Sequence, residues 1–167
     1  AGSSVMAAME GSRPVLVEIQ ALVSPSYLQM PRRLATGVDP QRLLQVLAVL
    51  ERRAGLAFGQ HDVYVSVAGG VRISEPAIDL PLALALASAR SDVPLPAVLA
   101  AFGEIGLAGE VRPVAHSEAR VHEAARLGLT MIASASGGAS APKGIDVRVV
   151  SNIAEAVASM VPRGVEA

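Results

Sequence analysis

The 167-residue chain has a composition that excludes several classes of protein. Its residues are 51% apolar but only 2% aromatic, its net charge is −1, and it has no cysteine. Disulfides, zinc–thiolate sites and thiol nucleophiles are therefore excluded, and the near-neutral charge argues against a surface that binds polyanions everywhere. No apolar run reaches the ~18 residues that would span a bilayer. We expect one domain, a cytoplasmic location and no membrane contact.

Strand and helix patterns are mixed along the chain without a regular βαβ rhythm. This order favours the α+β class, with mixed sheets packed against helices, over a doubly wound sheet. The core has to be built from Ala, Val, Leu and Ile because large aromatic side chains are scarce. In chain order, the patterns predict strands at 4–9 and 15–22, a loop at 24–38, a helix from 40 to about 54, a strand at 63–67, a helix at 76–89, strands at 99–102 and 106–111, a helix at 116–127, strands at 131–135 and 147–150 around a loop at 137–144, and a helix after 152.

The helix that begins at residue 40 has the clearest end signals. Asp39 is a good N-cap, Pro40 suits the first helical position, and Gly55 suits the C-terminal end. Its apolar positions predict this buried stripe: Leu43, Leu44, Val46, Leu47 and Leu50.

Arginines are concentrated in and just before this helix. Between residues 31 and 53 five arginines face only two acidic residues, which makes a locally positive surface. Arginine suits phosphate because its planar fork donates two hydrogen bonds at once. These arginines are therefore candidates for DNA contact: Arg32, Arg33, Arg42, Arg52 and Arg53. A solvated face, or ion pairs with a neighbouring subunit, would explain the same residues equally well.

The segment from residue 62 to residue 114 resembles the site of a Lon-type peptidase. Such enzymes carry the nucleophilic serine in a D-G-P-S-A-G turn before a buried helix, and a lysine after a G-E-x-x-x-x-G-x-V hairpin. Here the turn reads SEPAID, so Ala77 takes the serine position, and Glu118 takes the lysine position. A methyl group cannot attack a carbonyl, and a carboxylate is not an amine base. We therefore predict that this domain is not an enzyme. A relocated nucleophile, Ser74 or Ser117, is an unfavoured alternative, and Lys143 is the only lysine.

A closer resemblance is to the C-terminal Lon-like domain of the RadA family of bacterial DNA repair proteins, also called Sms. It covers residues 4–161 and is carried by MEGSRP (9–14), VEIQALV (17–23), PRR with ATG (31–37), LERRAG (50–55), DVYV (62–65), AGG (68–70), EPA with DL (75–80) and FGE (102–104).

The resemblance implies a Lon-like fold of the ribosomal protein S5 domain 2 type for a single domain over residues 1–167. It implies a piece cut from a longer chain, whose other domains are a zinc finger and a RecA-like ATPase that works on branched DNA during recombination and repair. In that family the Lon-like domain organises a hexameric ring and contacts duplex or branched DNA. The chain lacks the four-cysteine module and the G-x-x-x-x-G-K-[ST] loop, so we expect no cofactor in this domain and expect ATP, Mg and Zn in the missing domains. A pure oligomerisation module without DNA contact remains an alternative.

Metal and anion sites have weaker support. The three histidines, His61, His116 and His122, show no spacing typical of metal ligands, and we predict no metal site. Gly69 and Gly70 could form an anion nest, but a plain turn explains them better. Separately, three carboxylates could cluster where a peptidase dyad would stand: Glu75, Asp79 and Glu118.

Overall fold

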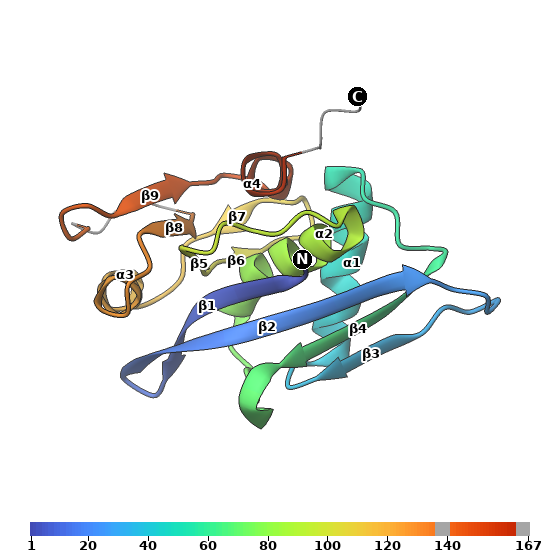
Figure 1. Ribbon diagram of the computed structural model, residues 1–167, viewed down its shortest axis with the longest axis horizontal. Helices are drawn as coiled ribbons and strands as arrows, with labels where there is room; N and C mark the ends of the chain where they lie inside the picture. Colours follow the sequence, from blue (N-terminus) through green and yellow to red (C-terminus); the bar gives the residue numbers. More distant parts are fainter. Residues whose placement is uncertain (136–140, 163–167) are drawn as a thin grey trace.

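The computed structural model describes residues 1–135 and 141–162, which form a mixed sheet with helices packed on it (Figure 1). The seven strands of the sheet run in the order β3-β4-β2-β1-β5-β8-β9. Strand β2 is antiparallel to both of its neighbours, and the other four pairs are parallel. The α+β prediction agrees with this mixed architecture. The strands of the sheet are β1 (Ser3–Glu10), β2 (Arg13–Pro25), β3 (Arg33–Thr36), β4 (His61–Val67), β5 (Leu99–Ala101), β8 (Met131–Ser134) and β9 (Asp146–Val149).

A separate two-stranded hairpin, β6 (Glu104–Ile105) and β7 (Val111–Arg112), lies beside the sheet. The sequence predicted a strand over 106–111, but most of that segment is the turn of the hairpin. Gly109 lies in this turn with a φ of 86°, a conformation that favours glycine.

Helix α1 (Pro40–Ala54) begins and ends where the sequence predicted. The Asp39 carboxylate accepts a hydrogen bond from the Gln41 N–H at 2.9 Å, and Gly55 ends the helix in the left-handed conformation. The predicted stripe needs one correction, because Leu44 is exposed whereas Val49 is buried. Both positions lie about 110° from the centre of the stripe on a helix with 3.6 residues per turn, so the surrounding structure, and not the period, buries residue 49.

Helix α2 (Asp79–Ser91) is the centre of the core. Ten of its residues are buried, and it packs against β1, β2, α1 and the C-terminal helix α4 (Ile153–Met160). The alanines that alternate with its leucines let these neighbours approach closely. The prediction of a central, nearly all-apolar helix is confirmed, although its first turn is a separate 3₁₀ helix, η2 (Pro76–Ile78).

Helix α3 (Ser117–Arg126) and helix α4 lie near their predicted positions. Asn152 caps α4 by accepting from the Glu155 N–H at 2.8 Å, as predicted. In α3, Arg120 is buried, whereas Leu127, which follows the helix, is exposed. Residues 137–140 of the predicted loop at 137–144 lie outside the described residues.

Strand β3 was missed, because residues 24–38 were predicted to be a loop. The segment has prolines and no clean period, and its strand character comes from parallel pairing with β4, from Arg33 opposite Val63 to Thr36 opposite Ser66. In the described parts of the chain, no helix is long and apolar enough to cross a membrane. The cytoplasmic location stays a prediction.

Candidate functional site

The turn that resembles a peptidase site is rigidly held against the β6–β7 hairpin. Ala77 lies in η2 and is buried. The Gly103 N–H donates to the Ala77 carbonyl at 2.9 Å, and the Leu80 N–H donates to the Gly103 carbonyl at 2.9 Å. A Cβ on Gly103 would lie 3.0 Å from the Val111 side chain, so a larger residue at this position would require that side chain to shift.

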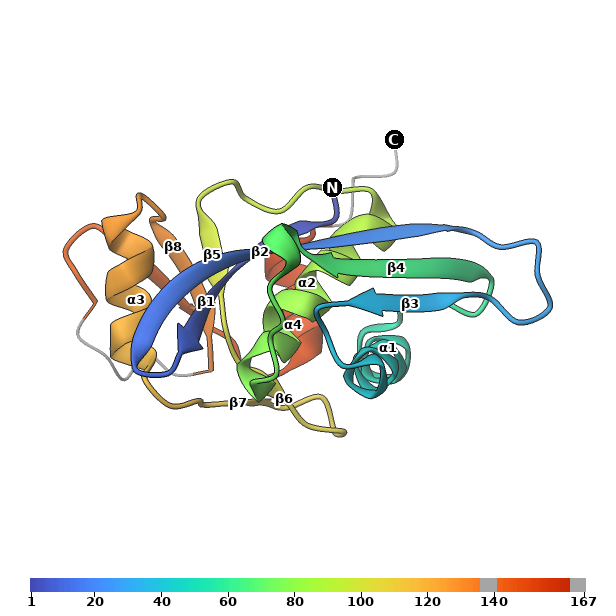
Figure 2. The ribbon, with the colours of Figure 1, turned by 90° about the horizontal axis from the view of Figure 1, so that it is seen from below.

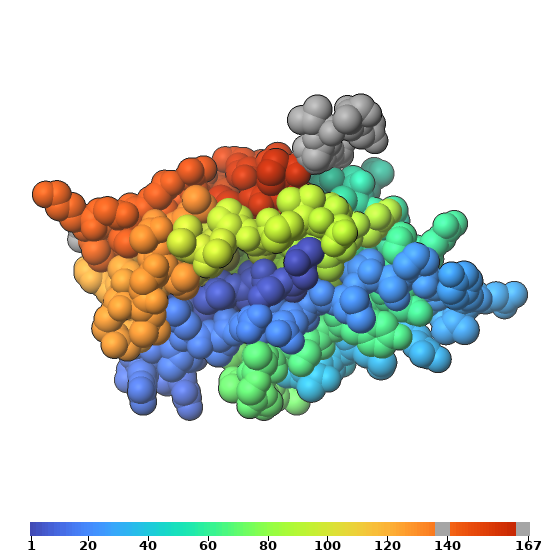
Figure 3. All heavy atoms as spheres, in the orientation of Figure 1, coloured from blue at the N-terminus to red at the C-terminus, as the bar shows by residue number. Residues whose placement is uncertain are grey.

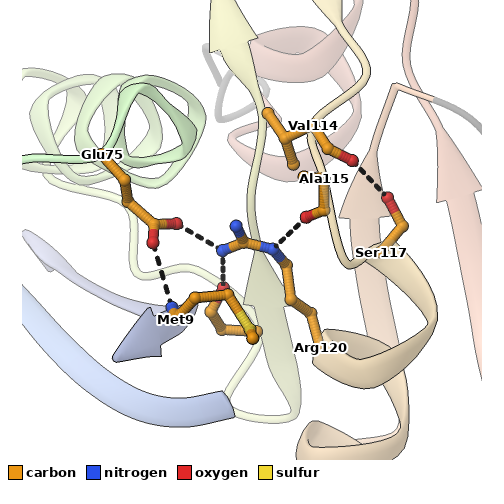
Figure 4. Close-up of polar contacts among 7 residues, drawn as sticks. Met9, Glu75, Val114, Ala115, Ser117 and Arg120 are labelled. Atoms are coloured by element: carbon orange, nitrogen blue, oxygen red, sulfur yellow. Dashed lines mark hydrogen bonds and ion pairs between the residues drawn. The ribbon is translucent and has the colours of Figure 1, made fainter. Parts of the chain in front are cut away.

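The cation that α3 contributes beside this turn is Arg120, two residues after Glu118, which occupies the position of the peptidase lysine (Figure 4). Its buried guanidinium donates to the Ala115 carbonyl at 3.0 Å and the Ala7 carbonyl at 2.8 Å, and forms an ion pair with Glu75. Its guanidinium carbon also lies 5.5 Å from the centre of the Phe102 ring, in the range of a cation–π contact. Arg120 thus ties β1, η2 and α3 together.

An open hollow of about 320 Å³ remains beside Ala77, and Glu75, Glu104 and Arg120 lie on its wall. Glu75 also accepts from the Met9 N–H at 3.1 Å, so both of its oxygens are engaged within the protein. The hollow therefore contains a neutralised charge pair.

The predicted cluster of three carboxylates does not form. Glu118 points away from the hollow: its side chain is 67% exposed and lies 3.8 Å from the His122 imidazole. Asp79 is buried against α1, so of these three carboxylates only Glu75 lines the hollow. The spacing along the sequence did not reveal that Glu118 is on the outer side of α3 whereas residue 120 faces inward.

The relocated nucleophiles gain no support from their surroundings. Ser74 is exposed, and Ser117 donates its hydroxyl hydrogen to the Val114 carbonyl at 2.9 Å (Figure 4). Lys143 is exposed between β8 and β9.

The five predicted DNA-binding arginines separate into two groups. Arg42 was expected to face outward, but it forms an ion pair with the buried Asp79 at 2.6 Å. Asp79 also accepts from the Ile105 N–H at 3.0 Å. Burial raises the pKa of Asp79, and the hydrogen bonds from Ile105 and Arg42 only partly offset this effect. Arg42 is therefore a structural residue.

Arg33 is also used within the fold. Its guanidinium donates to the Arg32 carbonyl at 3.0 Å, the Phe58 carbonyl at 2.9 Å and the His61 carbonyl. These bonds hold the start of β3 against the segment that leads into β4. Arg32 is exposed, and its N–H donates to Asp62 at 2.7 Å.

Arg52 and Arg53 end α1 and are exposed, and no described carboxylate forms an ion pair with either. Arg90, which the sequence analysis missed, lies at the end of α2 and donates to the Ala57 carbonyl at 2.8 Å. Arg33 and Arg90 thus both bond to the segment 55–62 that joins α1 to β4, Arg32 comes just before Arg33, and Arg52 and Arg53 lie at the end of α1 just before this segment. We call these five arginines the basic edge: Arg32, Arg33, Arg52, Arg53 and Arg90.

His61 lies beside arginines of the basic edge, and their positive charge affects its pKa. Burial lowers the pKa of His61, and the charges of Arg90 and Arg33 lower it further. In the described ranges, no three potential metal ligands come together around it or elsewhere. The two arginines thus give the surroundings of His61 a positive potential.

Known proteins match this chain over most of its length. A DNA repair protein RadA of Bacillus subtilis is 51% identical over 160 residues, covering 94% of this chain and 35% of the relative. The Brucella abortus RadA is 57% identical over 127 residues (76% of this chain, 27% of the relative), and the Escherichia coli RadA is 46% identical over 158 residues (93% and 34%). The chain belongs to the RadA family of DNA repair proteins. It spans about a third of the length of these relatives.

A family model described as subunit ChlI of Mg-chelatase matches residues 39–136, more than half of the chain, so the chain also belongs to the family of that model. This match corrects two predictions. We predicted that the domain is not an enzyme, from Ala77 and Glu118, and that it has no cofactor. The matched range contains both positions, and its family is described as a subunit of the enzyme Mg-chelatase. Both predictions are wrong because a replaced dyad excludes only Ser–Lys peptidase chemistry, and a missing loop motif excludes only one way to bind a nucleotide.

The described residues do not by themselves form a familiar cradle for nucleotide phosphates. Helix N-termini bind phosphate through free N–H groups and a positive dipole end. In the described parts of the chain each α-helix has a carboxylate at its cap or in its first turn: Asp39, Asp79, Glu118 and Glu155. A carboxylate at this place repels a phosphate, so no chemical step is assigned here to a nucleotide.

Two features of the site were not found from the sequence. Arg120 and Arg90 are single arginines in helices, and nothing near them in the sequence separates them from solvated residues. The only available signal was the placement of Arg120 at an otherwise apolar position, one residue before Val121 on the inner side of α3.

Proposed function

We propose that this chain is the Lon-like part of an ATP-dependent DNA repair protein, and that it binds duplex DNA through its basic edge while it assembles into a ring. The observation that carries the proposal is the pair Arg52 and Arg53, which are exposed and free of ion pairs with described carboxylates. Unpaired arginines on a chain of net charge −1 favour phosphate contacts without sequence preference.

The Lon-like assignment rests on the connection between the turn and the hairpin. A buried turn (η2) precedes a buried helix, the β6–β7 hairpin bonds to that turn, and α3 follows with its cation pointing back to the turn. The RadA family membership supports this assignment, and so does the position of Ala77 beside an open hollow.

The structure changes which arginines are suitable for a DNA-binding test. Replacing Arg33 or Arg42 removes bonds that hold the fold, so a loss of binding would not identify a contact. Arg52→Gln with Arg53→Gln keeps the apolar stems and removes only two charges. Arg126→Gln with Arg148→Gln is the matched control, because these two exposed arginines lie elsewhere and pair with neighbouring carboxylates.

The measurement is a mobility-shift titration of a duplex at several salt concentrations. The Arg52/Arg53 variant should bind more weakly to every duplex sequence, and its slope of log affinity against log salt should fall by about 2, since each lost phosphate contact removes about 0.9. The control variant should keep the slope of the unmodified chain. Equal slopes for the two variants would mean that DNA contacts another part of the surface than the basic edge. If neither the unmodified chain nor its variants bind the duplex, the DNA part of the proposal is wrong.

A further inference from the structure

An apolar row crosses the face of the sheet that is formed by β2, β4 and β3. Strand pairing places Tyr64 opposite Leu22 on one side and opposite Leu34 on the other. The side chains of Leu22 and Leu34 are 61% and 55% exposed. The neighbouring residues Val63 and Val65 are buried, because side chains alternate between the two faces of a strand.

Polar rows flank this apolar row on the same face. Gln20, Ser66 and Thr36 form one of them, and on the other side Ser24 and Asp62 are paired. Together these residues line an open hollow of about 460 Å³ around the apolar row: Gln20, Leu22, Leu34, Thr36, Tyr64 and Ser66. The hollow has an apolar floor and hydrogen-bonding sides.

The connection between β2 and β3 carries more exposed apolar surface. It projects past the ends of the neighbouring strands (Figure 2) and stands out as a knob in the space-filling view (Figure 3). Its Tyr27 and Met30 side chains are 98% and 85% exposed, and Leu28 lies between them, also exposed. A knob of this kind is costly in water unless something covers it.

The knob and the hollow together form a large exposed apolar surface. Their five exposed apolar side chains present on the order of 600 Å², the upper end of what the largest patch on a monomer usually shows. A contact between two copies buries the knob of one and the hollow of the other, so with the flanking polar rows it buries about 800 Å² in total, roughly half of a standard interface, and a ring repeats this contact at every subunit.

We infer that a second copy of this chain covers this surface, with the knob of one copy (Tyr27, Leu28 and Met30) inserted into the hollow of the next. One chain thus carries both an apolar projection and an apolar depression, and such a pair of surfaces makes a head-to-tail contact, the kind of contact from which rings are built. The low net charge of −1 means that two copies repel each other little. The inference rests on the self-association in the proposed function and not on DNA binding.

DNA is a poorer match for this face than a second copy. Arg32 is the cation beside it, and its pKa is raised mainly by a hydrogen bond to Tyr64. Asp62 and Glu18 lie on the same strands, and Asp62 keeps its negative charge because the Arg32 N–H lowers the pKa of its carboxyl. A face with two carboxylates and one arginine attracts phosphates weakly.

Two variants test the contact by sedimentation velocity over a concentration series. The knob variant is Tyr27→Asp with Met30→Asp, and the hollow variant is Leu22→Asp with Leu34→Asp. Each should sediment as a monomer at concentrations where the unmodified chain associates. An equimolar mixture should regain association, because the knob variant keeps an intact hollow and the hollow variant keeps an intact knob. Leu107→Asp is the control: this leucine is exposed on the β6–β7 turn, and its replacement should leave association unchanged.

Because the chain has no cysteine, a crosslink can identify the contacting residues. A mixture of the single variants Tyr27→Cys and Ser66→Cys should form a mixed disulfide dimer on oxidation, at least tenfold faster than a mixture of Tyr27→Cys and Leu107→Cys. Equal crosslinking rates in the two mixtures, or association that survives in the knob variant, would overturn this contact while leaving self-association intact. A chain that stays monomeric at all concentrations would overturn both the contact and the ring. Weaker duplex binding by the knob variant, with unchanged association, would assign the surface to DNA and also overturn the inference.

Discussion

Replacing Arg42 by methionine tests whether this arginine stabilises the fold or is available to contact DNA. The change removes the guanidinium that lies 2.6 Å from the Asp79 carboxylate and keeps an apolar stem of similar length. The Asp79 side chain is only 3% exposed, and it would keep just the hydrogen bond from the Ile105 N–H. Breaking a fully buried pair costs about 3–5 kcal/mol. Because the Arg42 side chain is 25% exposed, water weakens the pair, and we expect a loss of about 2–3 kcal/mol in the free energy of unfolding.

Urea denaturation followed by circular dichroism measures this loss. For an m-value of about 2 kcal/mol per molar, the midpoint should fall by about 1 M or slightly more. Arg52→Met, on the same helix but exposed, should change the stability by less than about 0.5 kcal/mol. The double variant Arg42→Met with Asp79→Asn should recover most of the loss, since no buried charge is then left without a partner.

The pH dependence of the loss provides an independent check. Folding raises the pKa of Asp79, so the folded state takes up a proton there, and the stability from this group is greatest at low pH and falls as the pH rises through the raised pKa. Removing Arg42 raises this pKa further. The cost of Arg42→Met should therefore be larger at neutral pH than near the ordinary pKa range of carboxyl groups. A cost below about 0.5 kcal/mol, or the same cost at both pH values, would refute the structural role of Arg42.

Three other experiments test further parts of the fold. Gly37→Ala should lower the free energy of unfolding by about 3 kcal/mol or more, because the φ of Gly37 is 81° and a Cβ would lie 2.5 Å from a backbone oxygen. Gly11→Ala, in open space at a φ of 62°, should lower it by about 1 kcal/mol, and equal losses on thermal unfolding would contradict the steric argument. Leu43→Ala should cost about 2–5 kcal/mol and Leu44→Ala less than 1, and the reverse order in urea titrations would mean that the α1 stripe is misplaced. Hydrogen bonds from Ser151 lower the pKa of Glu155, so Glu155→Gln should reduce the melting temperature at pH values above the ordinary carboxyl pKa. The difference between the variant and the unmodified chain should disappear as the pH falls through the lowered pKa. A lower melting temperature of the variant that persists in acid would exclude these hydrogen bonds as its cause.

Local signals in the sequence were sufficient for most of the elements. Helix α1 lies between an aspartate cap and a left-handed glycine, and both act on backbone groups within two or three residues. The β1–β2 hairpin follows from alternating apolar residues, and α2 follows from a long apolar run with little competition from polar side chains. The family resemblance that short motifs predicted is also confirmed by the RadA relatives.

The enzyme and cofactor predictions failed because they treated two replaced residues and one missing loop as evidence about the function of the whole region. An absent motif excludes only the chemistry that needs this motif. The DNA contact, the ring and the extent of the domain stay predictions.

The chain alone determined which segments become helices and strands wherever the stabilising groups are close in sequence. Tertiary structure decided the direction of each arginine, because the partners are distant: Arg42 meets Asp79 37 residues away, and Arg120 meets Glu75 45 residues away. It also made β3 a strand, since only β4 supplies hydrogen bonds to a segment without a period of its own. The sequence does not distinguish an arginine that faces solvent from one that pairs with a buried carboxylate, because only the tertiary structure brings the carboxylate next to it.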